Sequence, residues 1–569
     1  MNKLKSFQLL GFVLVLVVIN ILADTYHTGI DLTAEKRFTL SATTKKLVQS
    51  IRQPMTLTVY LDGNLPAGFQ KLANRAEDVA SAFRSISKGN FLVEFERPGA
   101  GLSDTAKAIL FDSLQMMGIH PTNVKAQQKD GEKLEETLVF PGAVLSGKNG
   151  QVGLDFLEGQ SSMNGLASLN NAEALMEFKI ARAIMMLQRD SIPIVGYLTG
   201  NGQPLDYRVY DLVENVLRKD YYFKILPIDS VASIPMEFKA IVVAKPTRSF
   251  SRAQRLKIDQ YVMRGGKIIW AVDQLYASMD SLQRSNGSFV AYDQGLDLDE
   301  QLFKYGVRIN RDLVQDLESD KVPSVVGSMG GQPQIELLPW PYAPLLRNTN
   351  GHPIAKNLDF VSSSFPQSID TIATPGIAKQ VLLTTSNYAR SLQTPALVEW
   401  RSVKSEQDLA LFNQQQLPVA MLLEGTFRSA FGNRLSKEEL DTLAMLGVPF
   451  QATTKDKNSM VVLSDGDILL NPVNEQEGPL AMGMNSYTRQ PFANRDFISN
   501  VLFYLTGGED VIAARSKIFR LRLIDKDKME NDKLFWQALN IVLPLLLLVF
   551  FYFANAIYRK KKYAGSLVG

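Results

Sequence analysis

Two apolar segments without a charged residue, one near each end, constrain the fold of this chain more than any other feature. The first runs from Ser6 to Ala23 and the second from Leu534 to Tyr558. As helices they would extend about 27 and 37 Å at about 1.5 Å per residue, and the hydrocarbon core of a bilayer is about 30 Å thick. The sequence therefore predicts two transmembrane helices, over residues 6–23 and 534–558.

The second segment carries the stronger signal. Trp536 and Tyr558 lie near its ends, where aromatic side chains anchor a helix at the membrane interface, and Pro544 is tolerated in membrane helices. A buried helix of a soluble protein is the alternative. The first segment has the basic start of a signal peptide, but its apolar run is long and lacks a clear A-x-A cleavage site. We therefore expect an uncleaved anchor there.

Basic residues beside the two segments predict the orientation. Lys3 and Lys5 precede the first segment and residues 559–562 follow the second, and short basic flanks stay in the cytoplasm. The tails 1–5 and 559–569 are then cytoplasmic, and the region between the anchors is periplasmic. Six of the 61 basic residues lie in the tails, which leaves 55 against 58 acidic residues outside them, a net charge of −3. A mildly acidic body argues against nucleic acid binding.

The first part of the periplasmic region, residues 24–190, has the order of elements of a thioredoxin-like module. The expected elements are a helix capped by Ser41, strand 55–63, helix 66–88, strand 91–96, helix 103–118 and a hairpin around Asn149-Gly150. A capping box of Asn170 and Glu173 predicts the start of the helix that leads to the next domain. The chain has no cysteine, which excludes disulfides, thiol chemistry and thiolate metal sites.

The hairpin segment comes within one residue of a phosphate-binding loop. Gly142, Gly147 and Lys148 have the required spacing, but Asn149 stands where a Ser or Thr hydroxyl binds magnesium. The residues after Gly150 alternate as in a strand, whereas a P-loop opens a helix. Asn-Gly is also a strong signal for a two-residue hairpin turn. We therefore predict a hairpin rather than a nucleotide site, and no ATP hydrolysis by this chain.

Residues 191–510 have a different pattern, in which continuous apolar strands alternate with amphipathic helices. This pattern is typical of a parallel sheet covered on both faces, so we predict a doubly wound α/β domain. A segment rich in Gly, Pro and Ser, about residues 274–379, is interpreted as a long insertion, and such insertions are often functional or mobile. Residues 511–533 are expected to be a membrane-proximal strand or linker.

Doubly wound domains bind ligands at the carboxyl ends of their strands, and one loop of this kind stands out. Gly200, Asn201, Gly202 and Gln203 follow the first strand of the domain, so we consider them a candidate ligand or partner loop. They do not have the G-x-G-x-x-G spacing of a dinucleotide site. A tight strand-to-helix turn, in which glycine serves backbone geometry, is the alternative.

Asp273 and Asp465 end or interrupt apolar strands, which makes them candidate carboxylates at a sheet edge; turn-forming aspartates are the alternative. The three histidines have no metal-binding neighbour, and Ser161-Ser162 are interpreted as loop residues because no G-x-S-x-G elbow occurs. The acidic residues between 525 and 532 lack the glycine of a calcium loop. The sequence predicts no catalytic residue, no metal and no cofactor.

Five segments, in order along nearly the whole chain, resemble a known family. They are DLTAEKRFTLSATTKKLV, VYLDGNLPAGFQKL, YLTGNGQ, KIDQYVMRGGKIIWAVD and NRDFISNVLFYLTGGEDVIAARSKIFRLRLID. The chain is similar to the GldG family of gliding motility-associated ABC transporter auxiliary proteins, often labelled substrate-binding components. The resemblance implies an inner-membrane protein of gliding bacteria that works with a separate ATPase and a separate permease. It also implies a glutamine-amidotransferase-like, GIFT-type sheet domain.

The chain departs from this family at the candidate loop. Relatives often carry Gly-His-Gly-Glu where this sequence has Gly200 to Gln203, and the loss of both ionisable groups leaves no general base there. We therefore expect a non-catalytic auxiliary subunit that couples a transporter to an unknown periplasmic ligand or protein. The alternatives are a cell-envelope amidase or hydrolase that uses this loop, and a purely structural tether in the envelope.

Overall fold

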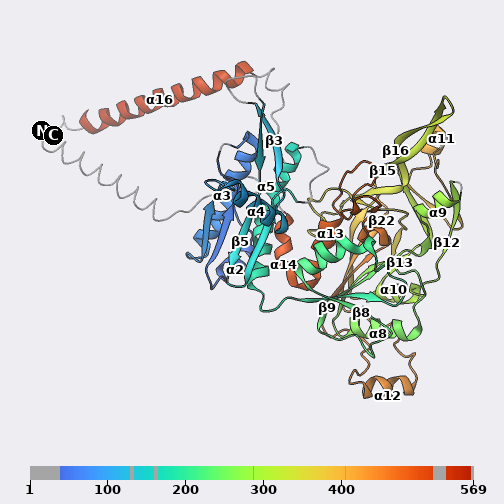
Figure 1. Ribbon diagram of the computed structural model, residues 1–569. Helices are drawn as coiled ribbons and strands as arrows, with labels where there is room; N and C mark the ends of the chain where they lie inside the picture. Colours follow the sequence, from blue (N-terminus) through green and yellow to red (C-terminus); the bar gives the residue numbers. More distant parts are fainter. Residues whose placement is uncertain are drawn as a thin grey trace. The chain divides into compact units, whose positions relative to one another are not determined.

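The computed structural model describes residues 39–63, 65–127, 134–158, 165–285, 287–403, 405–516 and 533–564 (Figure 1). Contacts divide the chain into two units, Met1–Ile518 and Phe519–Gly569. The predicted membrane helix over residues 6–23, Ser161-Ser162 and the acidic residues between 525 and 532 lie outside the described residues.

The N-terminal lobe, residues 39–188, contains a four-stranded sheet in the order β2-β1-β5-β6. β1 and β2 are parallel, β5 is antiparallel to β1, and β6 is antiparallel to β5. Its elements are α2 (Ala42–Gln49), β1 (Met55–Val59), α3 (Ala67–Ile86), β2 (Phe91–Phe95), α4 (Asp104–Met116), β3 (Thr122–Gln127), β4 (Leu134–Val139), β5 (Gly142–Gly147), β6 (Gly150–Asp155) and α5 (Gly165–Gln188). The predicted β-α-β-α-β-β order is present, with the additional β3–β4 hairpin after α4.

Of the two helix starts predicted from capping residues in the lobe, one is confirmed and one is wrong. Ser41 caps α2 as predicted, since its Oγ accepts a hydrogen bond from the Thr44 amide at 3.1 Å. The predicted capping box at Asn170 is wrong, because α5 already begins at Gly165. Asn170 and Glu173 instead bind the ammonium of Lys71, at 3.2 and 2.9 Å.

The predicted hairpin joins β5 and β6, but its turn lies one residue earlier than expected. Gly147 pairs with Gly150, so Lys148 and Asn149 occupy the central turn positions. Gly150 has a φ of 128°, a conformation that favours glycine. The Asn149 amide donates to the Leu187 carbonyl at 2.8 Å and fixes the hairpin to α5. Lys148 therefore lies in a strand turn and not at the helix N-terminus that a phosphate-binding loop requires.

The sheet domain, residues 191–516, is built on a seven-stranded sheet in the order β19-β22-β23-β10-β9-β7-β8 (Figure 1). Its strands are β7 (Ile194–Thr199), β8 (Tyr222–Pro227), β9 (Phe238–Ala244), β10 (Lys267–Ala271), β19 (Ile377–Thr384), β22 (Pro418–Gly425) and β23 (Asn458–Leu463). The five strands from β23 to β8 are parallel, whereas β22 and β19 are antiparallel to their neighbours. The parallel sheet that the sequence predicts is thus extended by two antiparallel strands.

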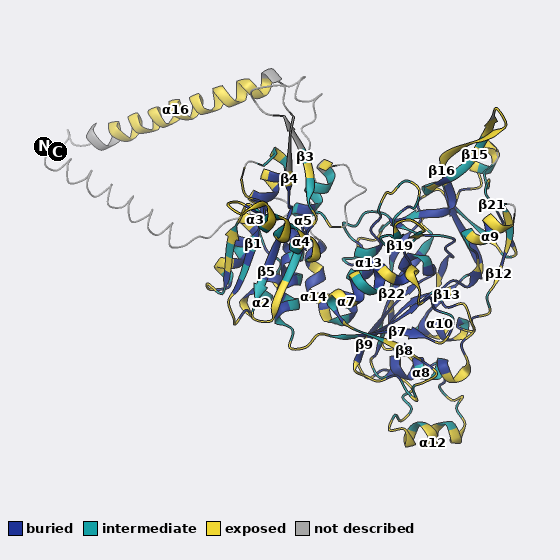
Figure 2. Cartoon of the chain, in the orientation of Figure 1, coloured by how far each residue is buried: buried dark blue, intermediate teal, exposed yellow. Residues whose placement is uncertain are grey.

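Both faces of the central strands β9, β10 and β23 are buried, whereas the edge strand β8 is partly exposed (Figure 2). Successive residues of β10 enter different cores: Ile268 and Trp270 belong to one, Ile269 and Ala271 to the other. The first core includes residues of α8 (Arg252–Met263) and α10 (Asp299–Tyr305). The second includes residues of α13 (Asn494–Phe503) and of the helical segment 207–220 that follows β7. Covering on both faces explains why the strands are apolar without alternation.

The segment predicted to be an insertion, about residues 274–379, consists of one long pair of strands, β15 and β16, and several short strands and helices. They are β11 (Leu275–Tyr276), α9 (Met279–Arg284), β12 (Ser288–Asp293), α10, β13 (Val307–Ile309), β14 (Asp312–Asp316), β15 (Ser319–Met329), β16 (Gln332–Leu346), β17 (Val361–Ser362) and β18 (Ile369–Thr371). β15 and β16 form the long hairpin that projects from the domain in Figure 1.

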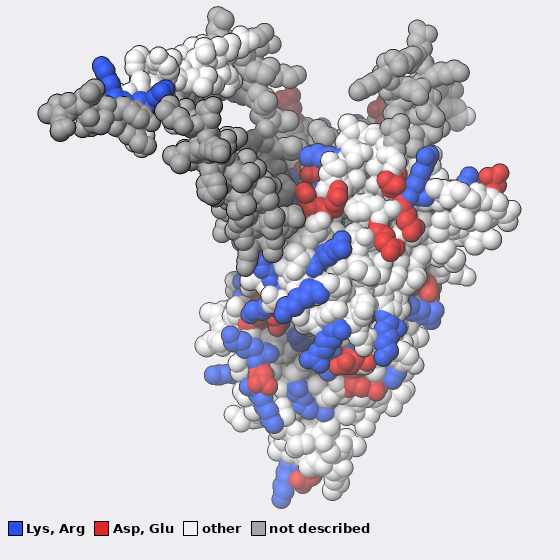
Figure 3. Space-filling view, turned by 90° about the vertical axis from the view of Figure 1, so that its left-hand side faces the viewer, with Lys and Arg blue, Asp and Glu red and all other residues white. Residues whose placement is uncertain are grey.

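The remaining elements are short. They are β20 (Ala389–Gln393), β21 (Ala396–Glu399), α11 (Glu406–Leu409), α12 (Lys437–Met445), η3 (Gly466–Leu469), β24 (Val473–Asn474), β25 (Gly478–Pro479), η4 (Tyr504–Gly508), α14 (Glu509–Ile512) and η5 (Ala513–Ser516). The prediction of a strand or linker from residue 511 is wrong for residues 511–516, which are helical. Basic and acidic side chains lie interspersed over the face drawn in Figure 3, which agrees with the small net charge.

Helix α5 packs against both the N-terminal lobe and the sheet domain. Met176 and Ile184 belong to the core of the lobe, while Phe178 belongs to the core of the sheet domain. The Phe178 ring meets the Phe503 ring edge-on, with centroids 6.1 Å apart. Arg182 pairs with Asp220 of the sheet domain at 2.6 Å. The predicted boundary near residue 190 therefore does not separate two independent contact units.

The described part of the second unit is a single helix, α16 (Lys533–Ala564). It confirms the predicted helix over residues 534–558. The stretch Phe535–Lys560 is strongly apolar, with a mean hydropathy of 2.3, and its apolar residues are not buried against the rest of the described chain. Among the described residues it is the one helix long and apolar enough to cross a membrane, by length and composition.

We predict that Phe178→Ala destabilises the chain strongly, because the side chain is almost fully buried where α5 meets the sheet domain. Truncation of a buried phenylalanine costs about 3 to 5 kcal/mol. The thermal unfolding midpoint measures the effect. Phe303→Ala is the matched control, since that ring is 51% exposed, and equal midpoints for the two variants would contradict the prediction.

Candidate functional site

Three adjacent parallel strands, β9, β10 and β23, bring charged residues to one edge of the sheet. Their last residues, Ala244, Ala271 and Leu463, are aligned in the pairing register. Lys245 follows β9 directly, and Asp273 comes two residues after β10. Because the carboxyl ends of parallel strands meet at one edge, residues distant in sequence become neighbours there.

The carboxyl-edge cluster consists of Lys245, Asp273, Asp465 and Asp467. Oxygens of the three carboxylates lie within 4.8 Å of one another. The Lys245 ammonium contacts Asp273 Oδ2 at 3.0 Å and Asp467 Oδ1 at 2.5 Å. Asp273 and Asp465 are 5% and 0% exposed, so these charges interact with little screening by water.

Burial shifts the titration of the cluster. It would lower the pKa of Lys245, but the carboxylates, above all Asp273 and Asp467, outweigh it and raise that pKa. Burial raises the pKa of Asp273 in spite of Lys245. The pKa of Asp465 is raised well above its ordinary value, first by burial and then by the negative charges of Asp467 and Asp273. One ammonium thus faces three carboxylates, and the buried carboxyl of Asp465 holds a proton more readily than an ordinary aspartate does.

The same carboxylates shape the backbone around them. Asp273 Oδ1 accepts a hydrogen bond from the Gly466 amide at 2.6 Å, and Asp465 accepts from the Ser364 and Asp467 amides at 2.8 and 2.7 Å. Position 466 requires glycine because the backbone of Lys245 lies close to it. A Cβ at this position would lie 2.6 Å from Lys245 Cβ and 2.9 Å from its Cα. The cluster therefore fixes the loop after β23 against the end of β9.

Three carboxylates in this arrangement are a donor set that hard cations such as Mg²⁺ or Ca²⁺ accept. Lys245 already places an ammonium against two of them, and backbone amides use both oxygens of Asp465. The residues therefore fit an internal counter-ion better than a resident metal, because a metal would have to displace the lysine.

A cleft of about 540 Å³ opens beside this cluster, a size typical of ligand sites. Lys245 and Asp467 line it together with residues of the segment 274–379, which forms much of its wall. Its lining is mixed, and hydroxyl, amide and carboxylate groups come from Ser278, Asp280, Gln283, Asp320, Ser362, Ser363, Ser364, Asn471, Asn485, Ser486 and Tyr487. Trp340 and Phe365 add aromatic surface.

The predicted loop Gly200 to Gln203 lies elsewhere on the same edge and does not line the cleft. It follows β7, beside β9, the position at which sheets with the order β8-β7-β9-β10-β23 commonly bind ligands. Here the loop after β9 closes that position. The Asn201 carbonyl accepts from the Thr247 and Arg248 amides at 2.9 and 3.0 Å.

Other side-chain atoms of this loop are used internally, whereas Asn201 Oδ1 and Gln203 Nε2 are buried without a hydrogen-bond partner among the described residues. Asn201 is 1% exposed, and its amide donates to the Ser249 carbonyl and to Gln254 Oε1, each at 2.9 Å. Gln203 Oε1 accepts a hydrogen bond from the backbone N–H of Asn201 at 2.8 Å. Gly200 and Gly202 have φ values of 127° and 77°, so glycine serves the turn at both positions. The geometry agrees with the tight-turn alternative.

The structure therefore brings the two predicted aspartates, Asp273 and Asp465, together and leaves the loop apart from them. Sequence reasoning missed Lys245 and Asp467. A signal was present, because Lys245 directly follows the apolar strand FKAIVVA and Asp467 lies two residues after Asp465. Comparing the residues that follow each predicted parallel strand would have selected them.

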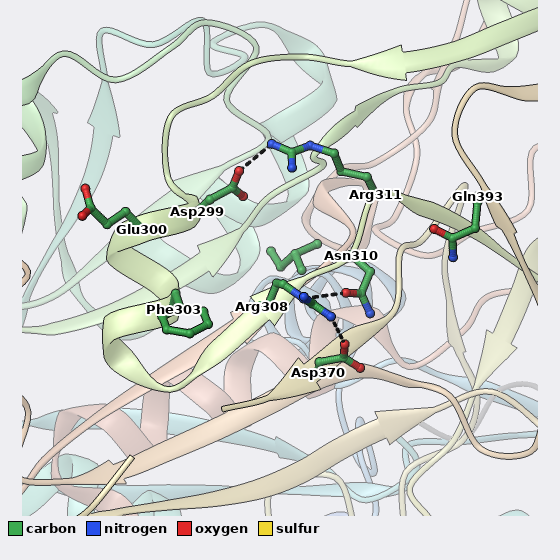
Figure 4. A pocket seen from close by; sticks show the side chains of 9 residues that line it. Asp299, Glu300, Phe303, Arg308, Asn310, Arg311, Asp370 and Gln393 are labelled. Atoms are coloured by element: carbon green, nitrogen blue, oxygen red, sulfur yellow. Dashed lines mark hydrogen bonds and ion pairs between the residues drawn. The ribbon is translucent and has the colours of Figure 1, made fainter. Parts of the chain in front are cut away.

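Another cavity, of about 680 Å³, has strongly charged walls that are already paired (Figure 4). Arg308 contacts Asp370 and Asn310 at 2.6 and 3.0 Å, and Arg311 contacts Asp299 at 2.6 Å. These side chains are about half exposed, so water screens them. The cleft at the carboxyl edge is the stronger candidate, because two of its lining residues, Lys245 and Asp467, belong to a charge cluster whose other members, Asp273 and Asp465, are buried.

Comparisons with known proteins give two family matches. The family described as an ABC-type uncharacterized transport system matches residues 193–501, which is the sheet domain. A domain of unknown function matches residues 34–146 of the N-terminal lobe. No curated protein matches the chain. A solved structure titled "mmIFT52 N-terminal domain" is 13% identical to this chain. The match covers 56% of this chain and 98% of that one, and its TM-score of 0.30 is too low to indicate a shared fold or function.

We predict that Lys245→Met destabilises the fold, because Asp273 and Asp467 lose their counter-ion in a buried site. Removing one partner of a buried ion pair costs about 3 to 5 kcal/mol. The thermal unfolding midpoint reports the loss, and a second substitution, Asp467→Asn, should restore part of it.

The matched control is Lys224→Met, which removes a surface pair with Glu237 whose side chains are 38% and 48% exposed. Such pairs contribute about 1 kcal/mol or less. A drop in midpoint for Lys245→Met no larger than for Lys224→Met would refute the role of Lys245 as the internal counter-ion.

Proposed function

We propose, on the premise that this chain belongs to the auxiliary family of ABC-type uncharacterized transport systems, that it is a non-catalytic, membrane-anchored subunit that receives a ligand or protein partner outside the cytoplasm. An auxiliary role in an ABC transport system follows from that membership, which covers residues 193–501. The absence of catalysis is proposed from the sequence and the site geometry. The link to gliding motility is proposed from the sequence resemblance alone.

The observation that carries the proposal is the cleft at the carboxyl edge of the seven-stranded sheet. Its volume of about 540 Å³ suits a small ligand or the end of a polypeptide. Three carboxylates, of Asp280, Asp320 and Asp467, line it against the cations Arg208 and Lys245. Lys245 is already paired, and Arg208 pairs with Asp206 at 2.8 Å. A ligand that donates hydrogen bonds suits such a lining better than an anion.

Two observations support a subunit that leaves ATP hydrolysis to a partner. Lys148 lies in a strand turn, so the near-match to a phosphate-binding loop offers no phosphate site. Asn201 and Gln203 are buried and neutral: the Asn201 side chain donates to Gln254, and Gln203 accepts from the Asn201 backbone N–H. An envelope hydrolase that used this loop would need a base that these residues do not supply.

The membrane and the cellular process complete the proposal. α16 supplies one anchor, the apolar segment over residues 6–23 supplies a second, and the basic tails hold both termini in the cytoplasm. The resemblance to GldG proteins suggests gliding motility as the process, with an ATPase and a permease as partners. The strand order β2-β1-β5-β6 of the lobe supports a thioredoxin-like module without cysteines, and β8-β7-β9-β10-β23 supports a doubly wound, GIFT-type sheet domain.

Purification from native membranes tests the subunit assignment. We expect the full chain to be recovered with an ATP-binding subunit and a membrane-spanning permease, and the complex to hydrolyse ATP. The chain purified alone should hydrolyse none. Its repeated recovery without either partner, or ATP hydrolysis by the chain alone, would show that the assignment is wrong.

Cysteine labelling tests the orientation, and the chain has no native cysteine to give background. Met445→Cys places a thiol at a side chain that is 88% exposed on α12. We expect a membrane-impermeant maleimide to label it in intact spheroplasts. Arg559→Cys, in the basic tail, should react only after lysis. The reverse pattern would place the sheet domain in the cytoplasm and overturn the proposed orientation.

A further inference from the structure

A groove of about 670 Å³ lies between the β15–β16 hairpin and the segment around Trp400, apart from the carboxyl-edge cluster. We name it the tryptophan groove. Its main apolar walls are formed by Pro323, Val325, Leu338, Trp340, Trp400 and Leu409. Val325 and Leu409 are 63% and 44% exposed, so much of this apolar surface faces solvent.

The apolar surface continues along one face of the hairpin. Val325 pairs with Ile335, and Pro323 pairs with Leu337. Cross-strand partners share a face, so Ile335 and Leu337 extend the surface that Pro323 and Val325 begin. Ile335 and Leu337 are 60% and 42% exposed, and the charged residue between them, Glu336, pairs with Ser324 on the opposite face. Exposed apolar side chains that share a face of this kind mark a candidate interaction site.

The edge of the hairpin is less suited to binding than its face. β15 is an edge strand of its sheet. It contains Pro323, which lacks a backbone N–H, and its pairing register shifts between Ser319 and Lys321 and again between Val325 and Gly327. Proline and bulges are the features that keep edge strands from pairing with a further strand. An occupant must therefore bind without continuing the sheet.

The walls of the groove indicate the chemistry of that occupant. The Trp340 and Trp400 rings lie with centroids 5.8 Å apart at 44°, and Trp340 Nε1 donates to the Trp400 carbonyl at 3.1 Å, which holds the pair in place. Pro339 and Pro341 flank Trp340. Grooves lined by aromatic residues bind proline-rich segments, which are already extended and make no backbone ladder.

Charge narrows the choice further. Arg401 is the one charged residue among the described residues that line the groove. It is exposed and forms no ion pair within the described part of the chain. A groove with apolar walls and a single unpaired guanidinium complements an apolar segment that carries one carboxylate. The groove is less suited to a lipid surface, because protein segments that bind membranes usually carry several basic residues and this groove has one.

We propose that the tryptophan groove binds an extended, proline-containing apolar segment of a partner polypeptide, with an acidic residue of that segment opposite Arg401. The Trp400 ring supplies contact surface together with the exposed side chains of Val325 and Leu409, and Arg401 fixes the register. Trp340 is 2% exposed and acts by holding Trp400 in place. The inference goes beyond the cleft at the carboxyl edge and does not depend on a ligand there.

The test uses the full chain in lipid nanodiscs and a short synthetic peptide of alternating proline and leucine with one aspartate. Binding is measured by calorimetry and by intrinsic tryptophan fluorescence, and the Trp400 signal is taken as the difference from the Trp400→Phe variant, because the chain also contains Trp270, Trp340 and Trp536. We expect Trp400→Ala to weaken binding at least about tenfold, as truncation of a central aromatic residue does. Trp400→Phe should restore part of the affinity. Tyr388→Ala, at a ring 64% exposed that does not line the groove, is the matched control.

A double-mutant cycle tests the charge. Arg401→Ala should weaken the aspartate peptide about two- to fivefold, the range for an exposed ion pair, and have no effect on a peptide with asparagine in its place. Arg248→Ala, at another exposed arginine, should change the affinity of neither the aspartate peptide nor the asparagine peptide. Thermal midpoints equal to that of the unaltered chain show that the variants are folded.

Three outcomes would overturn the proposal. The first is no binding of the peptide to the unaltered chain, and the second is equal binding by a folded Trp400→Ala variant. The third is capture of the groove by a lipid: a long-chain carboxylate that changes Trp400 fluorescence, while the peptide does not, would identify the groove as a lipid site.

Discussion

Burial of both faces of the central strands of the seven-stranded sheet is the constraint on which the rest of this structure depends. Alternate residues of β9, β10 and β23 enter two different cores, so neither face of these strands is open to a ligand. Only the strand ends remain for polar chemistry. Lys245, Asp273 and Asp465 occupy those ends, and their register places them side by side. The position of the cleft is thus a consequence of how the sheet is covered.

The usual ligand position of such a sheet is occupied by the protein itself. The loops after β7 and β9 are joined through hydrogen bonds of Asn201 to Thr247, Arg248 and Ser249. The cleft instead lies over β10 and β23, where the segment 274–379 supplies much of the wall. Lys245 stabilises this arrangement, since its ammonium offsets the repulsion among carboxylates that also hold the loop after β23. A substitution there acts on the fold and on the cleft together.

Two further contacts organise the unit. α5 shares its side chains between two cores, so the N-terminal lobe and the sheet domain are stabilised by one helix. Trp340 lines both the cleft and the tryptophan groove, which places a single indole between the ligand site and the apolar hairpin. The segment 274–379 therefore contributes to both candidate surfaces, although its composition alone suggests a loop.

The sequence by itself determined the local features: the helix over residues 534–558, the cap at Ser41, the apolar strands and the β5–β6 hairpin. Each depends on residues close in the chain, through periodicity, turn residues and capping. It also marked Asp273 and Asp465 as strand-end carboxylates. Only the tertiary structure decided that Lys245 and Asp467 join them, that Asn201 closes its own loop, and that α5 begins before Asn170. Those outcomes depend on the order and register of strands and on the packing of distant segments, and residue patterns do not encode which segments will meet.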